Sequence, residues 1–549
     1  MSTCERFETT EINGRNRLFS TTKTIIETAF YGNNVQAVTD LKMAYELAKK
    51  SPKTIVTDQP IKHTSELGLP KNAVMLVDNH GRVVGRTAAA RQILGRPGVD
   101  NAELEAILRE AVYQGEARQF YQAQAIVGLD EEFMLKAHLM VPQGYELNLL
   151  SYLLNFQILN AEYAKRYATS KPYSEDDIYL YCDPEWHDPQ YPDGLALFDP
   201  EHNVAAILGL RYFGELKKAT LTLAWATAHR NGYTACHGGE KTFHFKDKQD
   251  KVFAFYGLSG SGKSTLTHAK HAGKFDDITI LHDDAFIIDR KNGSSIALEP
   301  AYFDKTSDYL PGSKEMEYFT TVMNVGVTQD MQGKKTLVTD DLRNGNGRTI
   351  KSRYSAKNRV DREQAPLDSI FWIMKDDSLP PVVKLSDPVI AATFGLTLAT
   401  KRSTAENVIG ESRDKLVIEP FANPFRVYPL TEDYHDFKEL FEKQQANCYI
   451  INTDSYNGKN IDKDTTLGIL EAIANETAEW TKFGALPQMS YLSIPGYEVD
   501  LNDATYAKKL RQRLQDRLVW VNNYTKTHPK EELPVEITTK LEELITKLN

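Results

Sequence analysis

The sequence predicts an α/β protein with more than one domain, on the basis of three observations. The chain has 549 residues, whereas a single hydrophobic core seldom serves more than about 250–300 residues. From residue 251 onward it contains short, nearly continuous apolar runs, which are typical of strands buried on both faces. One of these runs leads directly into a glycine-rich loop that precedes a helix-compatible segment.

Composition narrows the class of protein. Hydrophobic residues make up 41% of the chain and charged residues 26%, the balance of an ordinary folded protein. The net charge of -10 argues against general binding of nucleic acid, which needs clustered positive charge. No apolar run approaches the ~20 residues that span a bilayer, and the polar N-terminus lacks a secretory signal. The four cysteines show no metal-binding spacing, so we expect a cytoplasmic protein with no membrane partner.

Three segments are predicted along the chain. Residues 1–240 mix helical and strand-like patterns and form an N-terminal α/β domain. Residues 241–525 form a nucleotide-binding α/β domain. Its strand-like runs are KVFAFYG (251–257), ITILHDD (278–284), SIFWIM (369–374) and CYIINT (448–453). Residues 526–549 form a helical tail whose apolar residues share one face, and we expect this face to pack onto the body of the protein rather than onto a partner.

A phosphate-binding loop is the most specific motif. Gly257, Gly262, Lys263 and Ser264 fit the pattern G-x-x-x-x-G-K-[ST] between a strand and a helix. Glycines allow successive backbone N–H groups to point at phosphate oxygens, and the N-terminus of the helix adds its dipole. Lys263 would neutralise the β and γ phosphates, and Ser264 would bind the Mg²⁺ of the nucleotide.

Two further groups of polar residues are weak signals by themselves and indicate a functional site only in combination with this loop. Asp283 and Asp284 end an apolar run, where a metal-binding carboxylate is expected, although paired Asp residues also occur in ordinary turns. Lys217 and Lys218 precede a single histidine, His237. Adjacent lysines usually coat a solvated face, and a lone histidine is more often structural than a ligand.

Taken in order, these motifs resemble the ATP-dependent phosphoenolpyruvate carboxykinases. The resemblance rests on Tyr-x-Gly-Glu-x-Lys-Lys (here YFGELKK, 212–218), the single His, the loop GLSGSGKST (257–265) and the Asp pair. SIFWIMKDDSLPPVVKLS (369–386) and CYIINTDSYNGKNIDKDTT (448–466) are similar to further family segments. The resemblance covers roughly residues 205–500. GTP-dependent relatives usually carry a cysteine in the loop, and Ser261 here favours ATP.

This resemblance implies a two-domain carboxykinase-like fold and the conversion of oxaloacetate and ATP into phosphoenolpyruvate, CO₂ and ADP, with Mn²⁺ at the substrate and Mg²⁺ on the nucleotide. It implies catalytic roles for Lys217, Lys218, Lys263 and Arg353, with Tyr212 and Arg86 beside the substrate. The implied metal-binding residues are Lys218, His237 and Asp284 for Mn²⁺, Ser264 for Mg²⁺, and Asp283 in support. The implied nucleotide-binding residues are Gly257, Leu258, Ser259, Gly260, Ser261, Gly262, Lys263, Ser264, Thr265, Lys305, Glu317 and Thr465.

Four positions depart from the family pattern or stay ambiguous. Arg353 aligns with the family's phosphoryl-binding arginine by its distance from Asp361, and Arg348 is the alternative. Arg86 follows a glycine as in the family, but the Pro-Lys-Asp-Lys that follows the arginine in the family is missing. The residues after Asp284 are apolar, and Asn460 stands where an adenine-stacking arginine is expected.

Two other functions remain open. The scaffold could serve a kinase that phosphorylates a different small molecule or a protein hydroxyl, which the altered Arg86 segment favours. It could also serve a non-catalytic nucleotide-binding regulator. The combination of Lys263, Ser264, Asp283 and Asp284 argues against that regulator, and Lys218 with His237 argues against a plain kinase, which needs no second metal site.

Overall fold

A computed structural model describes residues 3, 7–78, 85–158, 161–258, 260–401, 406–407 and 416–548, with the backbone alone at 86, 157–158, 161–162 and 406–407. The chain forms two compact units, and neither is a continuous stretch of sequence. Met1–Thr227, Leu298–Lys357 and Thr404–Gly410 make the first unit, and Ala228–Ala297, Asn358–Ser403 and Glu411–Asn549 make the second. The segment Leu298–Lys357, inside the predicted nucleotide-binding domain, therefore folds with the N-terminal unit.

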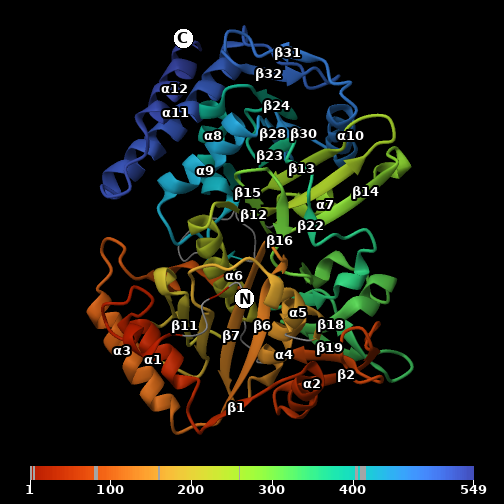
Figure 1. Ribbon diagram of the computed structural model, residues 1–549. Helices are drawn as coiled ribbons and strands as arrows, with labels where there is room; N and C mark the ends of the chain where they lie inside the picture. Colours follow the sequence, from red (N-terminus) through yellow and green to blue (C-terminus); the bar gives the residue numbers. More distant parts are fainter. Residues whose placement is uncertain are drawn as a thin grey trace. The chain divides into compact units, whose positions relative to one another are not determined.

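The first unit contains an eight-stranded and a five-stranded sheet (Figure 1). The larger sheet has the order β1-β6-β7-β9-β11-β10-β5, with β8 paired to β6, and the smaller has the order β17-β21-β18-β3-β2. Strands of the larger sheet are β1 (Val35–Ala37), β5 (Arg91–Ile93), β6 (Phe120–Asp130), β7 (Phe133–Pro142), β8 (Gln157–Ile158), β9 (Ile178–Asp183), β10 (Leu195–Asp199) and β11 (Val204–Leu208). Strands of the smaller sheet are β2 (Thr54–Pro60), β3 (Val74–Asp78), β17 (Tyr302–Lys305), β18 (Phe319–Met323) and β21 (Arg348–Lys351).

Helices cover these sheets according to their apolar faces. α1 and α3 bury Ile26, Leu104 and Leu108 against the larger sheet, and α4 is buried along its whole length. Ser20 and Asp100 directly precede α1 and α3, and the side chain of each accepts a hydrogen bond from the first turn of its helix. The helices of this unit are α1 (Thr21–Ala29), α2 (Leu41–Lys50), α3 (Asn101–Gly115), α4 (Glu146–Asn155), α5 (Ala161–Thr169) and most of α6 (Phe213–Arg230).

The second unit is built on an eleven-stranded sheet with the order β22-β16-β15-β12-β13-β23-β28-β24-β32-β31, with β14 paired to β12. β13, β23 and β28 lie next to one another and run parallel. The strands are β12 (Tyr233–His244), β13 (Lys251–Tyr256), β14 (Asp277–His282), β15 (Ala285–Asp289), β16 (Ser295–Ala297), β22 (Arg362–Glu363), β23 (Ser369–Met374), β24 (Val382–Leu385), β28 (Asn447–Asn452), β31 (Trp480–Lys482) and β32 (Met489–Leu492). The four strand-like runs predicted in this half are thus confirmed as β13, β14, β23 and β28.

Both faces of the central strands are covered, as their continuous apolar sequences predict. On one face Phe253 and Phe371 pack with residues of α10. On the other face Trp372 contacts the ring of Phe437 from α9 at 5.3 Å between ring centroids. The helices are α7 (Lys263–His268), α8 (Pro388–Leu396), α9 (Leu430–Lys443), α10 (Lys463–Ala474), α11 (Ala504–Thr527) and α12 (Val535–Thr546).

The predicted tail helix is α12, and it packs within the second unit. Ile537, Leu541 and Leu544 are buried. Glu536 accepts hydrogen bonds from Tyr434 and Lys438 of α9, each at 2.8 Å. Among the described residues, no helix combines the length and the apolar character needed to cross a membrane.

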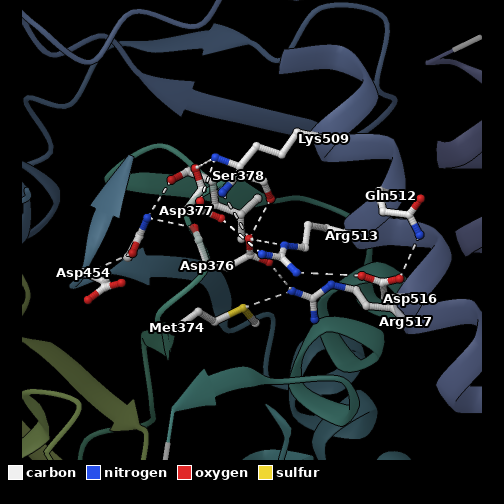
Figure 2. A network of polar contacts seen from close by, with 12 residues as sticks. Met374, Asp376, Asp377, Ser378, Asp454, Lys509, Gln512, Arg513, Asp516 and Arg517 are labelled. Atoms are coloured by element: carbon white, nitrogen blue, oxygen red, sulfur yellow. Dashed lines mark hydrogen bonds and ion pairs between the residues drawn. The ribbon is translucent and has the colours of Figure 1, made fainter. Parts of the chain in front are cut away.

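A buried ion pair joins α11 to the central sheet (Figure 2). Arg517 is 2% exposed, and its guanidinium lies 3.1 Å from the carboxylate of Asp376, two residues after β23. The same guanidinium donates to the carbonyl oxygen of Thr397. Arg513 and Lys509 of α11 form ion pairs with Asp377 at 3.3 and 2.8 Å.

We expect Asp376→Asn to lower the free energy of unfolding by about 3–5 kcal/mol, because it leaves the buried charge of Arg517 without a counterion. Urea unfolding followed by fluorescence measures this change. Lys62→Met is the control, since the Lys62–Glu317 pair is about half exposed and should contribute nothing measurable. Equal stability of Asp376→Asn and the natural protein would contradict the prediction.

Candidate functional site

The loop between β13 and α7 has the backbone of a phosphate-binding loop. Gly260 and Gly262 have φ angles of +82° and +104°, which side chains disfavour. A Cβ atom on Gly257 would come within 2.3 Å of the Ser261 hydroxyl oxygen, so the tight turn also requires glycine there. The loop leads directly into α7, which begins at Lys263. Leu258 is buried, Ser264 and Thr265 are exposed, and Ser259 lies outside the described residues.

Lys263, His237 and Asp284 meet beside this loop. Lys263 is 7% exposed, and its Nζ atom lies 3.5 Å from Oδ1 of Asp284. Nε2 of His237 lies 3.1 Å from the same oxygen. β12 carries His237, and β15 begins directly after Asp284, with His237 paired to Ala285 in antiparallel register. Gly239, two residues after His237, allows α7 to lie close to β12, because a Cβ on Gly239 would be 2.2 Å from the hydroxyl oxygen of Thr267 on α7.

Asp283 is the buried member of the Asp pair. Burial by itself would raise its pKa, but a hydrogen bond with His268 and the charges of His268 and His282 hold the pKa below its usual range. The carboxylate lies 3.3 Å from Nε2 of His268. Asp283 is therefore ionised across the physiological pH range.

Two side chains beside the phosphate loop, those of His237 and Asp284, are of types that bind divalent cations. Nδ1 of His237 donates a hydrogen bond to the carbonyl oxygen of Ala422, which leaves Nε2 to bind a ligand on the side of Asp284. No group of three or more His, Cys, Asp or Glu side chains that could hold a metal occurs in the part of the chain that the structure describes. The predicted set has only two such residues beside the loop, and its third member, Lys218, belongs to the first unit. The contact with Ala422 has no signal in the sequence.

In the first unit, a second cluster surrounds the ring of Phe303 on β17. Nζ of Lys217 lies 5.5 Å from the ring centroid, and the ring of Tyr212 lies 6.2 Å away. Lys217 also forms an ion pair of 2.8 Å with Glu299, and both side chains are fully buried. Lys218 is half-buried, and its Nζ lies 5.6 Å from the ring of Trp225. Neither Glu299 nor Phe303 was predicted from the sequence, although Glu299 is an acid inside the apolar stretch IALEPAYF (296–303), which is a usable signal.

The two candidate arginines have different surroundings. Arg348 lies opposite Lys305 in the antiparallel pair of β17 and β21. It is 7% exposed, and its guanidinium carbon lies 5.7 Å from the ring of Phe303. Arg353 follows β21 in a short 3₁₀ turn and donates to the hydroxyl of Tyr163 at 2.9 Å. The structure thus brings Arg348, and not Arg353, into contact with the Phe303 ring that Lys217 also contacts.

The remaining predicted residues lie as follows. Lys305 ends β17 and is half-buried. Glu317 is exposed and paired with Lys62 at 2.8 Å. Thr465 lies in the first turn of α10, where its N–H donates to the capping carboxylate of Asp462 at 2.7 Å. The backbone of Arg86 forms β4 (Arg86–Thr87), and its side chain lies outside the described residues.

A buried acid on β12 gives the second unit a pH-dependent stability. Glu240 is fully buried and accepts a hydrogen bond of 2.9 Å from the hydroxyl of Ser295. Burial raises its pKa from 4.5 to about 8, and the charge of Glu363 adds to this rise. The folded state therefore holds this proton more tightly than the unfolded state. Its stabilising contribution is complete below pH 4.5 and is lost as the pH rises toward 8.

We expect Glu240→Gln to abolish this loss, because the amide stays neutral. The stability of the variant relative to the natural protein should then increase by up to about 1.4 kcal/mol per pH unit over this range. Unfolding midpoints measured at several pH values test the effect. A stability difference that stays constant with pH would contradict it.

Together, the glycine-rich loop at the end of β13 and the adjacent Lys263, His237 and Asp284 are the features expected of a phosphate-binding site in an α/β protein. A family model described as phosphoenolpyruvate carboxykinase matches residues 91–521. The chain belongs to this family, in its ATP-dependent form, as the sequence resemblance predicted.

Curated relatives agree with this assignment at low identity. The chain is 24% identical to phosphoenolpyruvate carboxykinase (ATP) of Aeropyrum pernix over 53% of its length and 60% of that protein. It is 21% identical to the glycosomal enzyme of Trypanosoma brucei brucei over 70% of its length and 81% of that protein. For the enzyme of Saccharomyces cerevisiae the identity is 24%, over 68% of each chain.

Proposed function

We propose that this chain converts oxaloacetate and ATP into phosphoenolpyruvate, CO₂ and ADP, the activity that the names of its relatives describe. The observation that carries the proposal is the convergence of Lys263 and His237 on one carboxylate oxygen of Asp284, beside the phosphate loop. A nucleotide loop alone fits many kinases. A histidine whose other nitrogen is held by a backbone carbonyl supports the proposed second metal site, which simple phosphoryl transfer does not need.

The reaction consists of two steps, a decarboxylation and a phosphoryl transfer. The bond from the oxaloacetate carbon chain to the departing carboxylate breaks, CO₂ leaves, and the electron pair remains as an enolate. The enolate oxygen then attacks the γ-phosphorus of ATP, and the bond from that phosphorus to the β-γ bridging oxygen breaks to release ADP. Negative charge develops first on the enolate oxygen and then over the phosphoryl oxygens.

Cationic side chains of the protein stabilise this charge. Lys263 neutralises the β and γ phosphates, and Lys217, which is paired with Glu299, contacts the transferring phosphoryl group. His237, Asp284 and Lys218 would hold Mn²⁺, and Ser264 with support from Asp283 would hold Mg²⁺. When bound, these ions would supply positive charge to the enolate and phosphate oxygens. Tyr212 and Arg86 orient the substrate.

We assign the phosphoryl-binding arginine to Arg348 rather than Arg353. The guanidinium of Arg348 and the amine of Lys217 both contact the ring of Phe303. Arg348 also lies opposite Lys305 in the smaller sheet. Arginine suits this position because its charge is permanent and its planar fork matches phosphate oxygens.

A kinase acting on another acceptor is the second candidate, because the sequence after Arg86 lacks the lysines of the family motif. The two functions are separated by measuring ADP formation by the full chain with ATP, Mg²⁺ and Mn²⁺, with and without oxaloacetate, while phosphoenolpyruvate is followed in parallel. Equal amounts of ADP and phosphoenolpyruvate that depend on oxaloacetate support the carboxykinase. ADP formation that ignores oxaloacetate would overturn it and favour the kinase.

A further inference from the structure

The phosphate loop is held by a side chain from a distant part of the second unit. The hydroxyl of Thr453 donates a 2.8 Å hydrogen bond to the carbonyl oxygen of Ser261. Its methyl group lies beneath the next residue, because a Cβ built on Gly262 would be 3.8 Å from Cγ2 of Thr453. Thr453 thus bonds to Ser261 and lies beside Gly262, the two residues that immediately precede Lys263.

This contact fixes the direction of the N–H of Gly262, a group that can donate a hydrogen bond to a phosphate. The described chain contains no cis peptide bonds, so the bond between Ser261 and Gly262 is trans. In a planar trans peptide the C=O and the following N–H point in opposite directions. A Ser261 carbonyl held toward Thr453 therefore turns the N–H of Gly262 away from it. Gly262 has a φ of +104°, and because glycine tolerates a wide range of φ, this residue alone would not hold the peptide in one orientation.

Hydrogen bonds to the central sheet and to the segment after β23 hold Thr453 in place. Its N–H donates to the carbonyl oxygen of Met374 at 3.1 Å, at the end of β23, the strand next to β13. The preceding residue, Asn452, is fully buried, and its amide donates to the carbonyl oxygens of Asp376 and Leu379 at 2.9 and 2.7 Å. Asp376 is in turn bound by Arg517 of α11 (Figure 2). The hydroxyl of Thr453 is consequently fixed relative to the strand that carries the phosphate loop.

We propose that Thr453 is a positioning residue for nucleotide binding: its bond to Ser261 aims the N–H of Gly262 at the phosphates of the bound nucleotide. The residue need not touch the nucleotide, since it acts through the peptide of Ser261 and Gly262. This inference rests on the proposed function only in that the phosphate loop binds a nucleoside di- or triphosphate.

The matched substitutions are Thr453→Val, which removes the hydroxyl and keeps the shape, and Thr453→Ser, which keeps the hydroxyl. Thr431→Val is the control, because the Thr431 hydroxyl also donates to backbone carbonyls distant in sequence, those of Glu531 and Glu532, and this residue is likewise half-buried. MgADP binding to each full-length variant is measured by calorimetry, with KM for ATP, kcat and the melting temperature alongside.

We expect Thr453→Val to weaken MgADP binding about five- to tenfold, the effect of losing one hydrogen bond that orients a donor. Thr453→Ser should bind within about twofold of the natural protein, as should Thr431→Val. Unchanged binding by Thr453→Val, or equal weakening by Thr453→Val and Thr453→Ser, would overturn the proposal. Absence of phosphoenolpyruvate formation by the natural protein would overturn the proposed reaction instead, because MgADP binding is measured independently of it.

Discussion

Replacing Lys263 by methionine is expected to lower kcat for phosphoenolpyruvate formation by at least on the order of 10³-fold. The Nζ atom of Lys263 is almost buried beside the phosphate loop and lies 3.5 Å from Asp284. In the variant, the negative charges of Asp284 and of the transferring phosphoryl group would lie close together without this cation between them. Methionine preserves the length and apolar contacts of the side chain, so the lost charge is isolated from lost packing. Steady-state kinetics under saturating ATP and oxaloacetate measure the change.

The control for this prediction is Lys246→Met, which removes the same charge from the second unit at a side chain that is 79% exposed. Its kcat should stay within about twofold of the natural value, because an exposed ion pair is screened by solvent. If Lys263→Met kept more than a tenth of the natural kcat, the phosphate loop would not be the site of phosphoryl transfer.

The second large effect distinguishes the two arginines. We expect Arg348→Gln to lower kcat on the order of 10³-fold, the size of effect that a charge-stabilising arginine has in phosphoryl transfer. Arg353→Gln should change kcat by less than about tenfold, since Arg353 donates a hydrogen bond to the hydroxyl of Tyr163 on α5. The same kinetic assay, with a circular dichroism spectrum of each variant, measures both effects. The reverse order of effects would return the role to Arg353.

Local patterns in the sequence predicted the second unit well. The runs at 251–257, 278–284, 369–374 and 448–453 became strands because each is apolar enough to be covered on both faces. The phosphate loop was predicted from a motif that includes Gly257 and Gly262, and the backbone has a φ of +104° at Gly262 and little room for a Cβ at Gly257. Such features depend on neighbouring residues, which is why the sequence carries them.

The pairing of strands that are distant in sequence could not be predicted from such local patterns. β18 pairs in parallel with β3, which brings Thr321 opposite Leu76, and no local pattern signals that partnership. The segment Leu298–Lys357 joins the first unit for this reason. Likewise, spacing to Asp361 favoured Arg353, whereas the register of β17 with β21 places Arg348 opposite Lys305. The supporting contacts of His237 with Ala422 and of Ser261 with Thr453 also depend on pairing of distant segments.

The destination of the γ-phosphoryl group tests the central claim most directly. The purified full-length protein is incubated with ATP labelled at the γ-phosphate, Mg²⁺, Mn²⁺ and oxaloacetate, and the labelled products are separated. The proposed function predicts that the label passes to phosphoenolpyruvate in step with CO₂ release, and that Lys263→Met abolishes this transfer. Label found only in inorganic phosphate, or on another acceptor while oxaloacetate stays unchanged, would contradict it.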